Sequence, residues 1–262
     1  MKLRMIQIDT FTDKVLSGNP AAVCPLEEWL DVELMQAIAA ENNLSETAFF
    51  VPSDKGGYGL RWFTPNVEVG LCGHATLAAG EVVLSDLEPG AEAASFETKS
   101  GILTVSRDGQ NLTMDFPARP AEPCVAPEIL LAGLGAPPSQ VLVGDDYIAV
   151  YESAAEVAAL SPDLNLFCQI DRRGVVVTAP GDDEGTDYVL RFFAPKNAVP
   201  EDPVTGNVQT ELAPYWAQQL GKKRLNVRQL SARGGVMVCE DRGERVAISG
   251  QCVRFLEGEL SL

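Results

Sequence analysis

The residues best suited to chemistry gather in segment 70–80, which reads Gly-Leu-Cys-Gly-His-Ala-Thr-Leu-Ala-Ala-Gly. It holds a thiol, Cys72, two residues before the chain's only histidine, His74. Gly73 between them lets a helix begin with free backbone N–H groups. Such a helix start attracts anions, because the N–H groups and the helix dipole both favour negative charge. The segment therefore predicts a carboxylate-binding site beside a thiol and an imidazole.

The elements around this segment decide between a functional and a purely structural interpretation. Taken alone, Cys72 fits a core thiol and His74 a satisfied polar residue, since unpaired cysteine is among the most buried residue types. The helix expected over residues 75–84 is apolar on nearly every face, so we expect it to be buried. The functional interpretation gains weight because the same pattern occurs twice in the chain.

A similar strand, loop and helix start return 130 residues later. Residues 188–195, Tyr-Val-Leu-Arg-Phe-Phe-Ala-Pro, correspond to residues 59–65, Gly-Leu-Arg-Trp-Phe-Thr-Pro. Each strand leads through a loop to a glycine at an expected helix start, Gly73 in the first half and Gly206 in the second. The repeat indicates two αβ halves, each with strands around one buried helix. If the halves face each other, both helix starts would line one cleft for a small polar molecule.

The two halves differ where chemistry is expected. The first half carries Glu46 and His74. The corresponding positions of the second half hold Gly174 and Asn207, and its longer loop adds Asp202. A cleft between the halves would therefore hold one central acid, one imidazole and one further acid.

Composition narrows the class of protein. The chain has 262 residues, 46% of them hydrophobic, and a formal net charge of −17, which argues against nucleic acid or an anionic membrane surface as a partner. No apolar run approaches a membrane span, and the first residues lack the apolar core of a signal peptide. The six cysteines are scattered and no second histidine completes a metal site. We expect a cytoplasmic protein without a bound metal.

The periodicity predicts an ordered series of short elements that place these residues. Prolines at 117, 120 and 123 mark a domain boundary, so we expect an N-terminal αβ domain over residues 1–117 and a C-terminal αβ domain over residues 118–262, with a last strand able to cross back to the first. In the first domain, strands are expected over residues 2–9, 21–24, 47–51, 58–64, 95–105 and 111–116.

Five segments together resemble the PhzF family of phenazine biosynthesis-like isomerases, which shares its fold with diaminopimelate epimerase. They are Ser-Gly-Asn-Pro-Ala at 17–21, Glu-Asn-Asn-Leu-Ser-Glu-Thr-Ala-Phe at 41–49, Leu-Cys-Gly-His-Ala-Thr-Leu at 71–77, Glu-Asp-Pro-Val-Thr-Gly at 201–206 and Arg-Gly-Gly at 233–235. The resemblance implies an α/β (α+β) fold of two pseudo-symmetric domains, each a curved, mostly antiparallel sheet around a central buried helix. It also implies a site between the domains and a homodimer.

By the same resemblance, Glu46 is the acid and base that moves a proton along a ring substrate without cofactor or metal. His74 and Asp202 map to supporting polar groups. The expected substrate-binding residues lie in the same segments: Asn19, Ser45, Cys72, Gly73, Thr205, Gly206 and Asn207. The substrate implied is a small anionic metabolite.

One departure from the family pattern follows Gly206. Family members usually read Ser-Ala-His there, whereas this chain reads Asn207-Val208-Gln209. An Asn amide donates a hydrogen bond as a Ser hydroxyl does, but it cannot shuttle a proton. We therefore expect ligand binding to be retained, and the identity of the substrate stays open.

The leading hypothesis is a cofactor-independent isomerase or epimerase of the PhzF type, in which burial in a closing cleft raises the pKa of Glu46 toward neutrality. Three alternatives stay open. The chain could be a metabolite-binding protein that has lost its chemistry. It could be a racemase using Cys72, although Thr205 stands where a second thiol is needed. It could be a Cys72–His74 hydrolase, although side chains two apart do not face each other on a helix.

Overall fold

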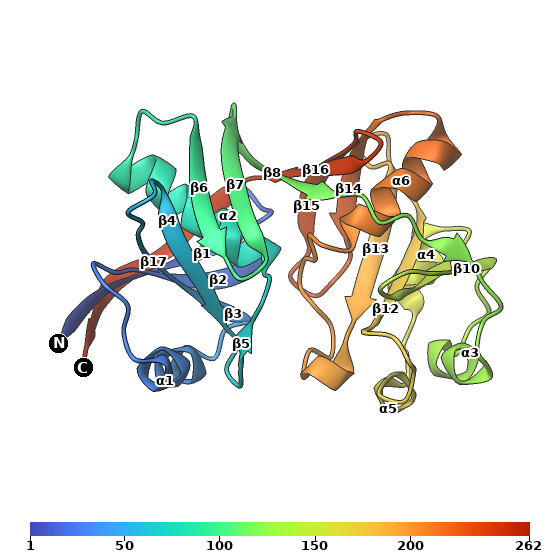
Figure 1. Cartoon of the computed structure of the whole chain (residues 1–262). Coiled ribbons are helices and arrows are strands. Elements are labelled where there is room, and N and C mark those ends of the chain that lie inside the picture. Colours follow the sequence, from blue (N-terminus) through green and yellow to red (C-terminus); the bar gives the residue numbers. More distant parts are fainter. The chain divides into compact units, whose positions relative to one another are not determined.

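The computed structural model describes all 262 residues as two compact units (Figure 1). The first comprises Met1–Asp115 and Ser249–Leu262, and the second comprises Phe116–Ile248. The boundary lies two residues before the expected one between residues 117 and 118, and the first unit includes the last segment, whose crossing back the sequence analysis allowed. That segment lies in the first unit because strand β17 (Cys252–Ser261) pairs antiparallel with β1 (Lys2–Thr10). The two chain ends meet there, where the Leu262 amide donates to the Met1 carbonyl at 2.9 Å.

The first unit is a mostly antiparallel sheet with the strand order β17-β1-β2-β3-β4-β6-β7-β8. Only the neighbours β2–β3 and β4–β6 are parallel. The short β5 pairs with β4. The strands not yet bounded are β2 (Asn19–Pro25), β3 (Glu46–Pro52), β4 (Tyr58–Phe63), β5 (Glu68–Val69), β6 (Ala93–Thr98), β7 (Gly101–Asp108) and β8 (Asn111–Pro117).

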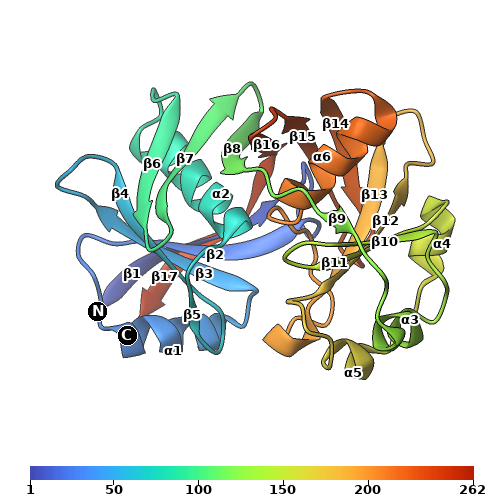
Figure 2. The same cartoon turned by 45° about the vertical axis from the view of Figure 1, so that its right-hand side comes forward.

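Helix α2 (Gly73–Val82) is the central helix of this unit, as predicted (Figure 2). All its residues except Gly73 and Glu81 are buried, and it packs against β1, β2, β3 and β7. A Cβ at Gly80 would collide with Val105 of β7, so glycine permits the close approach of helix and strand. Past Val82 the helix widens into one π-helical turn, η1 (Val83–Leu87). Helix α1 (Val32–Asn42) packs against β3 and β4.

The prediction of one strand over residues 95–105 was wrong. The chain reverses after Thr98, and β7 begins at Gly101 with a φ of 100°, which favours glycine. The Thr98 hydroxyl accepts from the Ser100 amide at 3.1 Å and donates to the Gly101 carbonyl at 2.7 Å. This local side-chain turn breaks an otherwise strand-like pattern.

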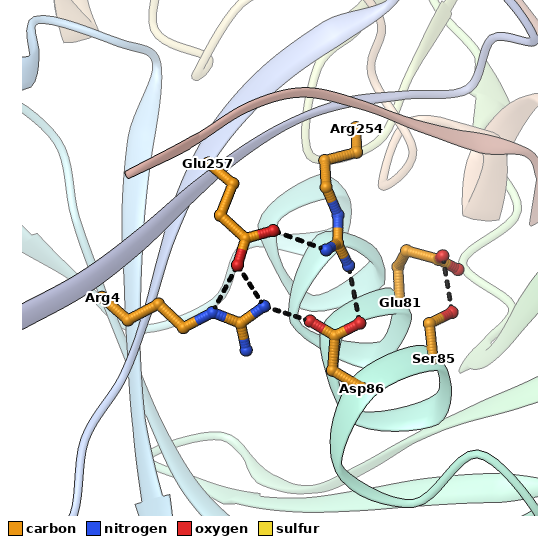
Figure 3. Close-up of polar contacts among 6 residues, drawn as sticks. All are labelled: Arg4, Glu81, Ser85, Asp86, Arg254 and Glu257. Atoms are coloured by element: carbon orange, nitrogen blue, oxygen red, sulfur yellow. Dashed lines mark hydrogen bonds and ion pairs between the residues drawn. The ribbon is translucent and has the colours of Figure 1, made fainter. Parts of the chain in front are cut away.

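Four charged side chains hold β17 and β1 against the end of the central helix (Figure 3). Arg254 of β17 donates to Asp86 of η1 and to Glu257, each at 2.8 Å. Arg4 of β1 donates to Glu257 at 2.9 Å through Nε and also pairs with Asp86. Burial alone would raise the pKa of Asp86, but the hydrogen bonds from Arg254 and Arg4 hold it below its ordinary value.

We expect Asp86→Asn to lower the free energy of unfolding at pH 7 by about 1–2 kcal/mol, because two arginines lose a shared charged acceptor. The lowered pKa means that this stabilisation is complete above the ordinary value of 3.8 and is lost as the pH falls through the folded pKa. Urea unfolding at pH 7 and pH 3 measures the difference. Glu81→Gln is the control, since its carboxylate accepts from Ser85 beside the network. Equal losses in both variants would contradict the prediction.

The second unit has the strand order β9-β10-β11-β12-β13-β14-β15, in which only β11–β12 and β13–β14 are parallel. Helices α3, α4 and α5 cover one face, around Val177, and α6 covers the other, where Trp216 donates to Thr178 at 3.0 Å. The elements are β9 (Glu122–Pro123), α3 (Glu128–Leu134), β10 (Gln140–Val143), β11 (Tyr147–Val150), α4 (Ala154–Ala159), α5 (Leu164–Phe167), β12 (Val175–Pro180), β13 (Tyr188–Phe193), η2 (Pro195–Asn197), α6 (Gln209–Leu220), β14 (Arg224–Gln229), β15 (Gly235–Asp241) and β16 (Arg245–Gly250).

The two units repeat the same topology. Strands β2-β3-β4-β6-β7 pair in the order parallel, antiparallel, parallel, antiparallel, and β11-β12-β13-β14-β15 pair in the same order. The helices α2 and α6 each follow the third strand of their series and precede the fourth. The fold is therefore the pseudo-symmetric αβ arrangement that the sequence repeat predicted. No helix reaches the length and apolar character needed to cross a membrane.

An ion pair recurs at the same place in both units. Arg61 of β4 donates two hydrogen bonds to the Glu68 carboxylate, of 2.8 and 3.0 Å. Arg191 of β13 donates two to the Glu201 carboxylate, of 2.7 and 3.0 Å. Each arginine also lies over a ring of its own strand. The arginine–glutamate pair thus anchors the loop that leads to the central helix in each unit, and with it the residues predicted to do chemistry.

Candidate functional site

The first-unit site forms where two parallel strands begin. Asn19 is the first residue of β2 and Glu46 is the first residue of β3. Because the two strands are parallel neighbours, both residues lie at the same end of the strands. The loop before Asn19 is tightly bent, with Gly18 at a φ of 65°. A Cβ there would collide with the Thr10 carbonyl, so only glycine allows this approach. The loop therefore fixes where Asn19 lies.

His74 stands at the centre of this group. Its Nε2 lies 3.2 Å from Oε2 of Glu46, and the two side chains are 9% and 19% exposed. Its Nδ1 lies 3.4 Å from the side-chain amide of Asn19, which in turn accepts from the Ser45 hydroxyl at 3.2 Å. Asn19, one of the expected substrate-binding residues, is fully buried against the imidazole.

Burial keeps the imidazole neutral. It lowers the pKa of His74 from 6.5 to about 4, and a hydrogen bond with the Pro20 backbone acts in the opposite direction. At neutral pH, His74 and Glu46 therefore do not form an ion pair. The approach of Oε2 lies outside hydrogen-bond geometry, so the buried Nε2 has no hydrogen-bond partner. An unsatisfied ring nitrogen beside a carboxyl group is costly in a core and is typical of a site that a ligand completes.

Cys72 faces the other side of the same ring. Its Sγ lies 3.6 Å from Nδ1 of His74. The prediction that side chains two apart would not meet was wrong here, because Cys72 is not a helical residue. It is the N-cap of α2, with extended backbone angles of −146° and 112°. The thiol, the imidazole and the Glu46 carboxyl group therefore form a row.

The start of α2 has the predicted form of an anion site. The helix begins at Gly73, and Cys72 at the N-cap makes no side-chain capping hydrogen bond. The N–H groups of the first helical turn have no intrahelical acceptor, since an α-helical amide bonds four residues back. These groups carry the positive end of the helix dipole.

Glu46, Cys72 and His74 also offer the ligand atoms that zinc prefers, all within 4.8 Å of one another. Their arrangement fits a metal poorly, however. The thiol and the carboxyl group approach opposite nitrogens of one ring, whereas a metal ion binds a single nitrogen. The geometry suits proton exchange along the row better, and the absence of a metal from the reaction stays a prediction.

The second-unit residues gather around a residue that the sequence analysis missed, Gln229. The Thr205 hydroxyl donates to the Asp202 carboxylate at 2.5 Å. Gln229, fully buried at the end of β14, accepts from the Thr205 amide at 2.9 Å and donates to the Asp202 carbonyl at 2.8 Å. No sequence signal marks Gln229, because the strand pairing alone brings it beside a loop more than twenty residues earlier.

Gly206 does not start the second central helix, so that prediction was wrong. The helix α6 begins at Gln209. Residues 206–208 form a tighter turn, in which the Gln209 amide donates to the Gly206 carbonyl and the Thr210 amide to the Asn207 carbonyl, at 3.0 and 3.1 Å. The bonds span three residues instead of four. Asn207 is half-buried beside this turn.

The departure from the family motif at Gln209 has a structural use. Gln209 is fully buried, accepts from the Tyr188 hydroxyl at 2.5 Å and donates to the Thr205 carbonyl at 3.1 Å. Its amide therefore ties strand β13 to the loop of Asp202 and Thr205. The Gln209 amide acts once as a donor and once as an acceptor. A neutral imidazole, as in the usual His of the family motif, also has one donor and one acceptor.

The chain matches known proteins along its whole length. A family model described as phenazine biosynthesis-like protein (PhzC-PhzF) matches residues 8–258. An uncharacterized isomerase of Pseudomonas aeruginosa is 52% identical over 262 residues, covering 100% of both chains. The crystal structure of a PhzF family protein from Enterococcus faecalis, 40% identical, superposes with a TM-score of 0.96 over 100% of both chains. A hydroxyproline epimerase from Agrobacterium vitis shares the fold alone, with a TM-score of 0.62 at 11% identity over 100% of this chain and 93% of its own.

Proposed function

Because the chain belongs to the phenazine biosynthesis-like (PhzC/PhzF) family, we propose that it is an isomerase that moves a proton on a small carboxylate-bearing metabolite. Glu46 is the acid and base. The observation that carries the proposal is the Glu46 carboxyl group 3.2 Å from a buried imidazole nitrogen that has no hydrogen-bond partner. A positioned acid–base group of this kind contributes about 10²–10⁴-fold to a rate.

In the proposed reaction, Glu46 takes a proton from one substrate carbon and returns it to another carbon. The electron pair moves through the substrate between the two steps, so no oxidant, reductant or cofactor is needed. The neutral His74 offers its open Nε2 to a substrate hydroxyl or to the protonated Glu46. The amides at the start of α2 hold the substrate carboxylate, as helix starts do for anions.

The second unit contributes Asp202 to the same reaction in this proposal. Its carboxylate accepts from the Thr205 hydroxyl, and Gln229 holds both the backbone of Asp202 and that of Thr205. One hydrogen bond therefore fixes the carboxylate itself and two more fix the backbone around it, which is the kind of support that a positioned catalytic or binding group needs. Its part is to hydrogen-bond the polar groups of the substrate.

Proton exchange measured by NMR in D₂O tests the function. The protein is incubated with the dihydro-hydroxyanthranilate precursor and with a panel of cyclic and amino-acid carboxylates. We expect deuterium to enter one compound at a carbon position, at a rate that Asp202→Asn reduces. Binding of a panel compound without any exchange would instead favour a metabolite-binding protein.

A thiol reaction is the second candidate, because Cys72 Sγ lies 3.6 Å from Nδ1 of His74 and Glu46 lies on the far side of the ring. We expect Cys72→Ser to keep the exchange rate within about threefold, because the proposed reaction forms no bond to sulfur and a hydroxyl fills nearly the same space. Cys168→Ser, at an exposed cysteine, is the control. A loss of a hundredfold or more in Cys72→Ser alone, on the order of a missing nucleophile, would favour the thiol reaction.

A further inference from the structure

We propose that the second unit carries a separate ligand site for a small organic ammonium ion with an apolar body. The site is a pocket of about 560 Å³ beside α4. Its size falls in the range of small-molecule pockets, about 300–1,000 Å³. It shares no residue with the predicted site. Its lining consists of Ala136, Pro137, Pro138, Ser139, Tyr151, Glu152, Glu156, Ala159 and Leu160.

The walls of this pocket are apolar and held in place. Two adjacent prolines, Pro137 and Pro138, limit the motion of the loop between α3 and β10. The Tyr151 hydroxyl donates to the Ala136 carbonyl at 3.0 Å. Ser139 bonds the Val150 carbonyl twice, through its amide at 2.8 Å and its hydroxyl at 2.9 Å. A ligand entering the pocket would therefore find it already formed, which reduces the entropic penalty of binding.

The charged groups of the lining are both acidic. Glu152 and Glu156 lie on it, and it contains no lysine or arginine. Two hydrogen bonds involve Glu156 at the start of α4: its carboxylate accepts from the Glu152 amide at 3.1 Å, and its own amide donates to the hydroxyl of the N-cap Ser153 at 3.3 Å. The hydrogen bond from the Glu152 amide therefore favours a position of the carboxylate beside the pocket.

The surroundings do not cancel this negative charge. Arg191 donates to the Leu160 carbonyl at 2.8 Å, but its guanidinium is already paired with both oxygens of Glu201. Burial raises the pKa of Tyr151 to about 12, and the charge of Glu156 acts in the same direction. The whole chain has a net charge of −17, so organic cations are also attracted at long range.

These features select the ligand by chemistry. Apolar walls take up a ring or a short alkyl group, and the two carboxylates pair with an ammonium group at the rim. An anion of the same shape would meet two like charges, and a neutral analogue would lose the charged pair. The ligand class is therefore a primary amine with a compact apolar body.

Calorimetry and ligand-observed NMR on the full chain test this with benzylammonium, benzyl alcohol and benzoate as probes of one shape and three charges. We expect benzylammonium to bind, and benzoate not to bind. The double variant Glu152→Gln/Glu156→Gln should weaken benzylammonium binding about tenfold or more by removing both counter-charges. The Ser153 cap of α4 uses the backbone amide of residue 156, and a Gln oxygen can still accept from the amide of residue 152, so α4 should stay folded. Ala159→Trp, which fills the pocket from α4, should abolish binding.

Glu46→Gln serves as the second control, since it alters only the first-unit site and should leave benzylammonium binding unchanged. Equal binding of all three probes, no binding of benzylammonium, or unchanged binding in the double variant or in Ala159→Trp would each overturn the proposal. Circular dichroism of every variant checks the fold. Failure of the exchange assay would leave these outcomes unaffected, because the two sites are tested by different ligands and different residues.

Discussion

Glu46→Gln is expected to lower the rate of substrate proton exchange by about 10²–10⁴-fold while changing ligand affinity only a few-fold. Gln has nearly the shape of Glu, and it can still hydrogen-bond, but it cannot accept and return a proton at neutral pH. The site around it should survive, because Asn19 and Ser45 hold His74 independently of the carboxyl group. Exchange in D₂O gives the rate, and calorimetry with the same compound gives the affinity.

The matched control is Glu41→Gln, an exposed glutamate five residues earlier, for which we expect no change. His74 gives a further check on the site, since it is the chain's only histidine and its ring signals need no assignment. In wild type and in Glu46→Gln, the ring should stay neutral as the pH is lowered, until the pH approaches its pKa of about 4. Undiminished exchange in Glu46→Gln with an intact ring titration would rule out Glu46 as the base.

Glu211→Gln is expected to stabilise the protein at neutral and alkaline pH. Glu211 lies on α6 and is 1% exposed, and its Oε2 is buried without a hydrogen-bond partner. The carboxyl group fills the space beside Gly144, where a Cβ would collide with it. Nearby Asp146, fully buried, is already paired with Arg173 through both carboxylate oxygens. One arginine thus faces two carboxyl groups.

This setting raises the pKa of Glu211 from 4.5 to about 7, first through burial and then through the charges of Asp146 and Asp145. Between these values the unfolded chain releases the proton and the folded chain keeps it. Stability therefore falls as the pH rises from about 4.5 to about 7 and is constant above. A gap of this size corresponds to about 3 kcal/mol. The Gln variant does not lose this stability, because Gln has no proton to release.

Urea unfolding from pH 4.5 to pH 8 measures this effect. We expect the free energy of unfolding of Glu211→Gln relative to wild type to increase across this range and to level off above pH 7. Glu184→Gln, at an exposed loop residue far from Glu211 in the sequence, is the control and should give a flat difference. A pH-independent difference in Glu211→Gln would contradict the prediction, because it would mean that the pKa of the carboxyl group is the same in the folded and unfolded chains.

The sequence by itself determined the fold class, the repeat and the central helices. These follow from local signals: an apolar segment too hydrophobic to be exposed, a glycine at its start, and the Arg-containing strand that recurs 130 residues later. The buried α2 and the matching strand order of both units confirm them. The family assignment was also contained in the sequence, since five ordered motifs carry it along almost the whole chain.

Only the tertiary structure decided which groups touch. Cys72 reaches His74 because an extended N-cap residue does not follow helical spacing. Gln229 supports Asp202, and Glu211 lies against the turn that holds Gly144, because strand pairing joins segments distant in the sequence. The last strand joined the first unit through β1, at the opposite end of the chain. Contacts and burial of this kind depend on long-range packing, and local patterns of residues do not encode them.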